Sequence, residues 1–108
     1  MSNEYLDLSI AIVKQACDDY EHALLTLKKM ENKETAIASI KKQLNAKSDI
    51  YAENVRKQRI ITAQKTINDC ERFFGGRWYS MLCAIDPNVL VRRIKEKVEE
   101  NIKQAAKK

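Results

Sequence analysis

Residues 6–27 read LDLSIAIVKQACDDYEHALLTL, and this stretch decides the fold class. Its apolar side chains recur at alternating gaps of four and three residues, the repeat of a coiled coil or of two antiparallel helices in contact. Further apolar residues widen the stripe to one side, which favours a helical bundle over a two-stranded coiled coil. The stripe can close within the chain or between chains. We expect a homo-oligomer that associates through Leu6, Ile10, Val13, Cys17, Tyr20, Leu24 and Leu27.

The composition of the whole chain supports the same fold class. The 108 residues are 44% hydrophobic and 32% charged, with only two glycines and one proline. A β-sandwich or barrel needs a turn every 8 to 12 residues, and these turn residues are too few to supply them. Neither a GxGxxG nor a GxxxxGK[ST] motif is present, which excludes the common nucleotide-binding loops. We therefore predict one all-α domain over residues 1–108, a small helical bundle.

The first helix is expected to end near residues 30–33, and the helical pattern then resumes. Apolar residues continue over 37–44 and restart in a different phase at 50–55. Ser48 is a candidate N-cap for a new helix. No glycine or proline forces a break between residues 32 and 74, so one long bent helix and two separate helices both fit the pattern.

The end of the chain adds a connector and a last helix. Gly75 follows the last apolar residue of the third stripe, so we expect it to cap that helix in the left-handed conformation. Residues 77–85 are predicted to form a short amphipathic helix. Asp86 and Pro87 then start the last helix, because an aspartate oxygen caps free amides and proline is tolerated in the first turn.

Four of the seven aromatic residues fall within seven positions around the glycine pair. Aromatic side chains bury large areas and also dominate protein interfaces. This corner is therefore either a tightly packed part of the core or a surface that binds a partner. Neighbouring side chains on a helix lie about 100° apart, so the adjacent phenylalanines cannot both face one narrow contact. The partner-binding candidates are Phe73, Phe74, Arg77, Trp78 and Tyr79.

The segment CERFFGGRWY at residues 70–79, followed by Leu82, Asp86 and an apolar, basic helix from Leu90, resembles a pattern in small uncharacterised proteins of phages and prophages of Gram-positive bacteria. The resemblance covers residues 70–98. Pro87, where those proteins usually have glycine, and the Gly-Gly link depart from the pattern. The resemblance implies a phage accessory protein that acts by binding, and it carries no catalytic residue.

Charge is distributed unevenly along the chain. Residues 1–32 hold three lysines and six acidic residues, whereas residues 33–108 hold seventeen lysines and arginines and nine acidic residues. Basic residues can contact phosphates, pair with an acidic protein surface, or simply face solvent. The candidates for binding nucleic acid or an acidic partner are Lys41, Lys42, Arg56, Lys57, Arg59, Arg92, Arg93 and Lys95.

No residue set for catalysis or metal binding is evident. His22 is the only histidine, and Asp18 and Asp19 near it make a weak metal signal that is better explained by a solvated helix face. Nucleophilic catalysis lacks a second base. The three cysteines have no zinc-ligand spacing, so we expect reduced thiols packed as small apolar residues. We expect no enzyme activity, cofactor or metal.

The sequence also carries no membrane span and no secretory signal, so we expect a cytosolic protein. The function predicted is a non-enzymatic protein-interaction module, a phage-encoded accessory protein that inhibits or modulates a host protein such as a defence nuclease. The alternative is a small basic protein that binds nucleic acid.

Overall fold

The computed structural model describes residues 4–106, with side chains described for residues 10–104, and within this range the chain is all-α. The molecule measures 56 × 28 × 26 Å. No helix among the described residues is long and apolar enough to cross a membrane. The helices are α1 (Glu4–Glu31), α2 (Lys33–Leu44), α3 (Asp49–Phe74), α4 (Arg77–Leu82) and α5 (Pro87–Ala106).

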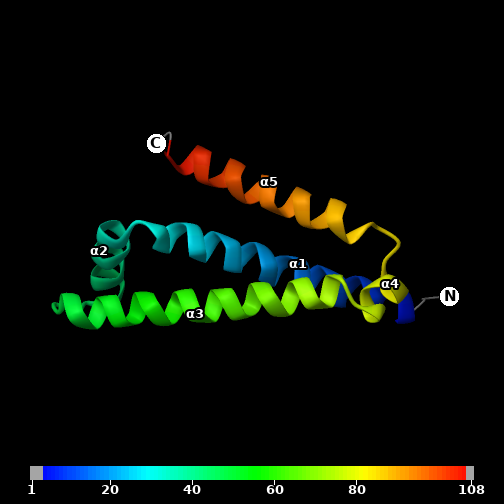
Figure 1. Cartoon of the computed structure of the whole chain (residues 1–108), viewed down its shortest axis with the longest axis horizontal. Coiled ribbons are helices and arrows are strands. Elements are labelled where there is room, and N and C mark those ends of the chain that lie inside the picture. The colour runs from blue at the N-terminus through cyan, green and yellow to red at the C-terminus, as the bar shows by residue number, and fades with distance from the viewer. Residues whose placement is uncertain (1–3, 107–108) are drawn as a thin grey trace.

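The helices α1 and α3 run antiparallel along the long axis and form the main helix pair of the bundle (Figure 1). At one end of the pair α2 crosses between them, and at the other end α4 turns the chain back. The last helix, α5, packs on α1 and points in the same direction as α1. The predicted helical bundle is confirmed.

The apolar stripe of α1 closes inside the chain. Tyr20 is fully buried, and the other members whose side chains are described pack against the same core, except Ile10, which is 57% exposed. The side chain of Leu6 lies outside the described residues. The core that receives the stripe includes Ala63, Ile67, Cys70 and Phe74 of α3 and Ile94 of α5. Self-association through these residues stays a prediction.

The middle of the chain forms two helices. Asn45 ends α2 in the left-handed conformation, with φ at 51°, and its amide bonds back to the carbonyls of Lys41 and Lys42. Asparagine is one of the few residues besides glycine that adopts this conformation readily. Ser48 caps α3 as predicted, because its hydroxyl accepts a hydrogen bond from the amide of Tyr51 at 3.2 Å. The caps explain how the chain breaks here without glycine or proline.

The predicted left-handed cap at Gly75 is wrong. Gly75 has φ at −87°, and neither glycine has positive φ. The glycine pair instead allows a close approach: a Cβ on Gly76 would lie 3.2 Å from the carbonyl oxygen of Arg72. The predicted start of α5 is confirmed, since Asp86 Oδ1 accepts a hydrogen bond from the amide of Asn88 at 2.8 Å and Pro87 is the first helical residue.

Candidate protein-docking surface

A cluster of four aromatic rings holds α4 against the end of the α1–α3 pair. The ring of Phe74 makes edge-to-face contacts with Tyr20 and Tyr79, at centroid distances of 5.5 and 5.7 Å. Phe73 adds a third edge-to-face contact to Tyr79 at 6.0 Å. Such pairs stabilise by about 0.5–1.5 kcal/mol beyond the area that they bury. Three of the rings are fully buried, so this part of the corner belongs to the core.

The hydroxyl groups of the two buried tyrosines are both satisfied. Tyr79 donates to the carbonyl oxygen of Ile85 at 2.8 Å, which fixes the link that follows α4. Tyr20 donates to Glu71 at 2.9 Å, which ties α1 to the end of α3. Burial raises the pKa of both tyrosines, and for Tyr20 the hydrogen bond to Glu71 adds to the effect. Both phenols are therefore neutral and structural.

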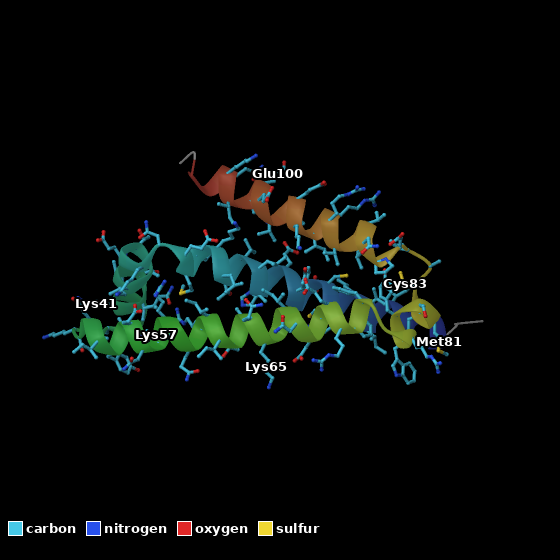
Figure 2. The ribbon with its side chains drawn as sticks, in the orientation of Figure 1. Lys41, Lys57, Lys65, Met81, Cys83 and Glu100 are labelled. Atoms are coloured by element: carbon cyan, nitrogen blue, oxygen red, sulfur yellow. The ribbon has the colours of Figure 1, made fainter. Side chains whose placement is uncertain are left out.

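The opposite side of α4 faces solvent with large apolar side chains. Trp78 is 70% exposed and Met81 is 76% exposed, and they lie three residues apart on one face of the helix. Ile85 is 50% exposed just beyond them. Figure 2 shows Met81 on α4, at one end of the molecule. We call Arg77, Trp78, Met81 and Ile85 the α4 surface.

A small cleft of about 360 Å³ adjoins the α4 surface, where α3 meets α4. Trp78 and the half-buried Phe73 supply its aromatic walls. The side chains of Arg72 and Asp69 also line it, so the cleft is apolar with a charged rim. This combination suits one apolar side chain of a partner with a polar group beside it.

The structure thus divides the five aromatic-corner candidates. Phe74 and Tyr79 are core residues, Phe73 is shared between core and cleft, and Arg77 and Trp78 are on the surface. Sequence reasoning missed Met81 and Ile85. The three-residue spacing of Trp78 and Met81 was the available signal. It identifies an exposed apolar face only once Tyr79 is known to point into the core.

Three of the basic candidates hold the α2 end together. Arg56 donates to the carbonyl oxygen of Met30 at 2.9 Å and pairs with Glu53 at 3.0 Å. Arg59 donates to the side-chain oxygen of Gln43 at 3.1 Å, and Lys41 pairs with Asp49 at 2.7 Å. These groups face other helices or a paired carboxylate, which removes them from any free phosphate-binding strip.

The remaining basic candidates are exposed but do not form one patch. Lys42 lies on α2 and Lys57 on α3. Arg92, Arg93 and Lys95 lie on α5, where Glu96, Glu99 and Glu100 share the exposed side with them. Figure 2 shows Glu100 on α5 far from Lys57 on α3. The structure therefore does not bring the eight basic candidates together.

The largest hollow, about 840 Å³, lies between α1, α2 and α3. Buried alanines on all three helices contribute to its lining, and its threonines are engaged locally: Thr26 donates to the carbonyl of His22, and Thr66 to that of Thr62. Asp19 and His22 both line it as exposed residues. Within residues 10–104 no three histidine, cysteine or acidic side chains gather as metal ligands do.

The three cysteines are free thiols that belong to one core. Cys70 is buried and Cys17 and Cys83 are half-buried. Cys70 donates weakly to the carbonyl oxygen of Ala16 at 3.6 Å. Burial raises the pKa of Cys17 and Cys70, which disfavours the thiolate that nucleophilic chemistry requires. The arrangement fits packing as small apolar side chains.

Comparison with known proteins identifies no relative of this chain: no protein-family model, curated protein or solved structure matches it.

Proposed function

We propose that this chain is a non-enzymatic protein-interaction module that binds its partner through the α4 surface and the adjoining cleft. The observation that carries the proposal is the exposure of Trp78 and Met81, at 70% and 76%, on a helix whose opposite side is fixed in the core. Tryptophan, methionine and arginine are the residues most enriched at protein interfaces.

The rigidity of α4 supports the same function. The edge-to-face rings and the bond from Tyr79 to Ile85 hold the short helix in one orientation before any partner arrives. A partner that covers Trp78 therefore does not need to order the surface that it binds, which lowers the entropic cost of association. Covering a large apolar side chain contributes about 1.5–3 kcal/mol.

The resemblance of residues 70–98 to small phage proteins supplies the setting of the proposal. In that setting the partner is a protein of the bacterial host, such as a defence nuclease, and binding inhibits or modulates it. Arg77 and Trp78 lie inside the segment that carries the resemblance.

Nucleic-acid binding is the competing function, and the geometry favours it less. The sequence places Arg56 and Arg59 on one helix face. In the structure their side chains form hydrogen bonds with Met30, Glu53 and Gln43. A protein that tracks phosphates needs its basic groups free and on one surface.

Affinity capture from cells of the source organism tests the proposal. The bait proteins are the wild type, a Trp78→Ser/Met81→Ser variant, and a Leu44→Ser/Tyr51→Ser control. The control removes two exposed apolar side chains, 44% and 53% exposed, from the opposite end of the molecule. We expect a protein retained by the wild type and the control and reduced at least tenfold with the α4 variant, because interface hot spots cost about 2 kcal/mol or more when truncated.

Two results would contradict the proposal. In the first, every captured protein is retained equally by the α4 variant. In the second, the wild type retards duplex DNA at low salt, with an affinity that falls steeply as salt rises, and captures no protein. The second result supports the nucleic-acid alternative, because counterion release gives that salt dependence.

A further inference from the structure

The outward side of α3 carries exposed residues at helical spacing, and the helices that pack on α3 do not cover this side. Ile50, Asn54, Lys57, Ile61, Lys65 and Arg72 recur at gaps of three, four or seven residues, and all six are exposed. We call these residues the outer face of α3. The helices that pack on α3 meet its other side, where Ala52, Ala63, Ile67 and Phe74 are buried.

Two of these residues are large apolar side chains in solvent. Ile50 is 78% exposed and Ile61 is 61% exposed. From Ile50 through Asn54 and Lys57 to Ile61 the gaps are four, three and four residues, the spacing of a coiled-coil contact in which apolar positions supply affinity and a polar residue fixes the register. The face from Ile50 to Arg72 is about 33 Å long at 1.5 Å per helical residue.

The charge of this face is mostly basic, with Lys57, Lys65 and Arg72 exposed on it and one exposed carboxylate, Asp69, between the last two. Residues 54–68 contain Arg56, Lys57, Arg59 and Lys65 and no acidic residue. The nearest preceding acid, Glu53, is paired with Arg56, and its side chain is only 17% exposed. Lys57 and Lys65 are therefore free to pair with a partner's carboxylates. Figure 2 shows both lysines along α3, on the way to Met81 at the α4 end.

We propose that the outer face of α3 binds an acidic amphipathic helix of the partner protein. This inference rests on the proposed function, and it gives the partner's chemistry: apolar side chains over Ile50 and Ile61, flanked by carboxylates against Lys57, Lys65 and Arg72. Arg72 also lines the cleft beside Trp78, so the outer face and the α4 surface are continuous.

The same observations disfavour the two other anionic ligands. Exposed isoleucines contribute nothing to phosphate contacts. An anionic membrane would need a continuous apolar side to enter the bilayer surface, whereas Asn54 and Lys57 separate the two isoleucines.

A designed peptide provides the test. The peptide is a helix of about four heptads, with leucine at the two contact positions and glutamate at the flanking positions; its counterpart has lysine for glutamate. Binding to the full chain is measured by anisotropy of a labelled peptide and by the emission of Trp78, the only tryptophan. We expect the acidic peptide to bind, the basic peptide not to bind, and the Trp78 emission to shift to shorter wavelength.

The variants are Lys57→Glu/Lys65→Glu and, as a control with the same change in net charge, Arg92→Glu/Arg93→Glu on α5. We expect the affinity for the acidic peptide to fall about tenfold or more in the first variant, because attraction becomes repulsion at two sites, and less than twofold in the control. Lys57→Gln/Lys65→Gln should give an intermediate loss. Circular dichroism checks that each variant is folded.

Three outcomes overturn the inference: the basic peptide binds equally well, the control variant loses as much affinity, or phosphatidylglycerol vesicles or duplex DNA bind through the same lysines more tightly than the peptide does. The Trp78→Ser/Met81→Ser variant separates the two proposals. If that variant keeps full affinity for the peptide while the lysine variant loses it, the α3 site stands and the α4 surface is not part of it. If the wild type captures a partner through Trp78 but does not bind the peptide, the α4 surface stands and the α3 site does not.

Discussion

At one end of the molecule α2 crosses the α1–α3 pair and is held by a small apolar core around Ile40 together with polar groups, whereas at the other end α4 is held by aromatic rings. The α2 end uses two arginines and a lysine, which bond to groups of the chain, and two capping side chains, those of Asn32 and Ser48. The α4 end buries three rings and leaves Trp78 and Met81 in solvent. Apolar side chains are exposed at both ends, Leu44, Ile50 and Tyr51 at the first and Trp78, Met81 and Ile85 at the second, and the tryptophan lies at the second. We propose the docking surface at the α4 end because tryptophan and methionine are enriched at protein interfaces.

The largest expected effect comes from breaking the aromatic end. Phe74→Ala should lower the free energy of unfolding by about 4 kcal/mol, because the ring is fully buried and contacts both tyrosines. Urea denaturation followed by circular dichroism measures the loss. Phe73→Ala is the matched control, since its ring is half-buried and should cost roughly half as much. Equal losses would show that the burial of the two rings does not determine how much each contributes to stability.

Removing the polar contacts of the α2 end should lower the free energy of unfolding by less. Arg56→Ala leaves the largely buried Glu53 without its cation and the carbonyl of Met30 without its donor, so we expect a loss of about 3 kcal/mol in the free energy of unfolding. The same urea titration applies. Lys57→Ala, one residue along and exposed, should change stability by less than about 0.5 kcal/mol. A Glu53→Leu/Arg56→Leu double variant that costs as much as Arg56→Ala alone would contradict the ion-pair explanation.

Tyr20 makes the stability of the aromatic end depend on pH. Because burial and the bond to Glu71 raise its pKa, its contribution is fully present below the unfolded value of about 10 and is lost as pH rises through the folded value. We expect the wild type to lose stability above about pH 10 more steeply than Tyr20→Phe, which has no proton to lose. Melting temperatures between pH 7 and 11 compare the two. Parallel curves would mean that Tyr20 does not titrate in the unfolding transition.

The smallest expected effect on stability is that of changing the exposed residues Trp78 and Met81. Trp78→Ser/Met81→Ser should leave the free energy of unfolding within about 0.5 kcal/mol of wild type, because both side chains are mostly in solvent. The measurement is the same urea titration. A loss above 2 kcal/mol would show that these residues serve the fold, and it would remove the reason to assign them to a partner.

The sequence predicted the helical class, the end of the first helix, the Ser48 cap and the Asp86–Pro87 start, because each depends on neighbours within one or two turns. It left open the break between α2 and α3, since the break depends on a left-handed asparagine at position 45, and a chain without glycine or proline there fits one helix as well. The Gly75 cap was predicted wrongly, because a glycine permits positive φ without requiring it.

The candidate site was less predictable for a physical reason. Which side of a six-residue helix faces solvent depends on the rings that it meets, and Tyr79 meets partners on α1 and α3. Arg56 was assigned to a phosphate or acidic partner because its own acceptor lies 26 residues away in the chain, beyond any local pattern. Both observations concern contacts between helices, and the periodicity of a single helix does not contain them.

The placement of α5 divides the fold into units of unequal stability. α5 packs on α1 through Ile94 and Val98, and its ion pair from Lys97 to Glu21 at 3.3 Å is largely exposed on the lysine side. The α1–α3 pair, by contrast, is closed at both ends. Amide hydrogens of α5 are therefore expected to exchange with solvent through local openings, and those of α1 and α3 only through global unfolding. The last helix is the part of the chain that can separate while the docking surfaces on α3 and α4 stay in place.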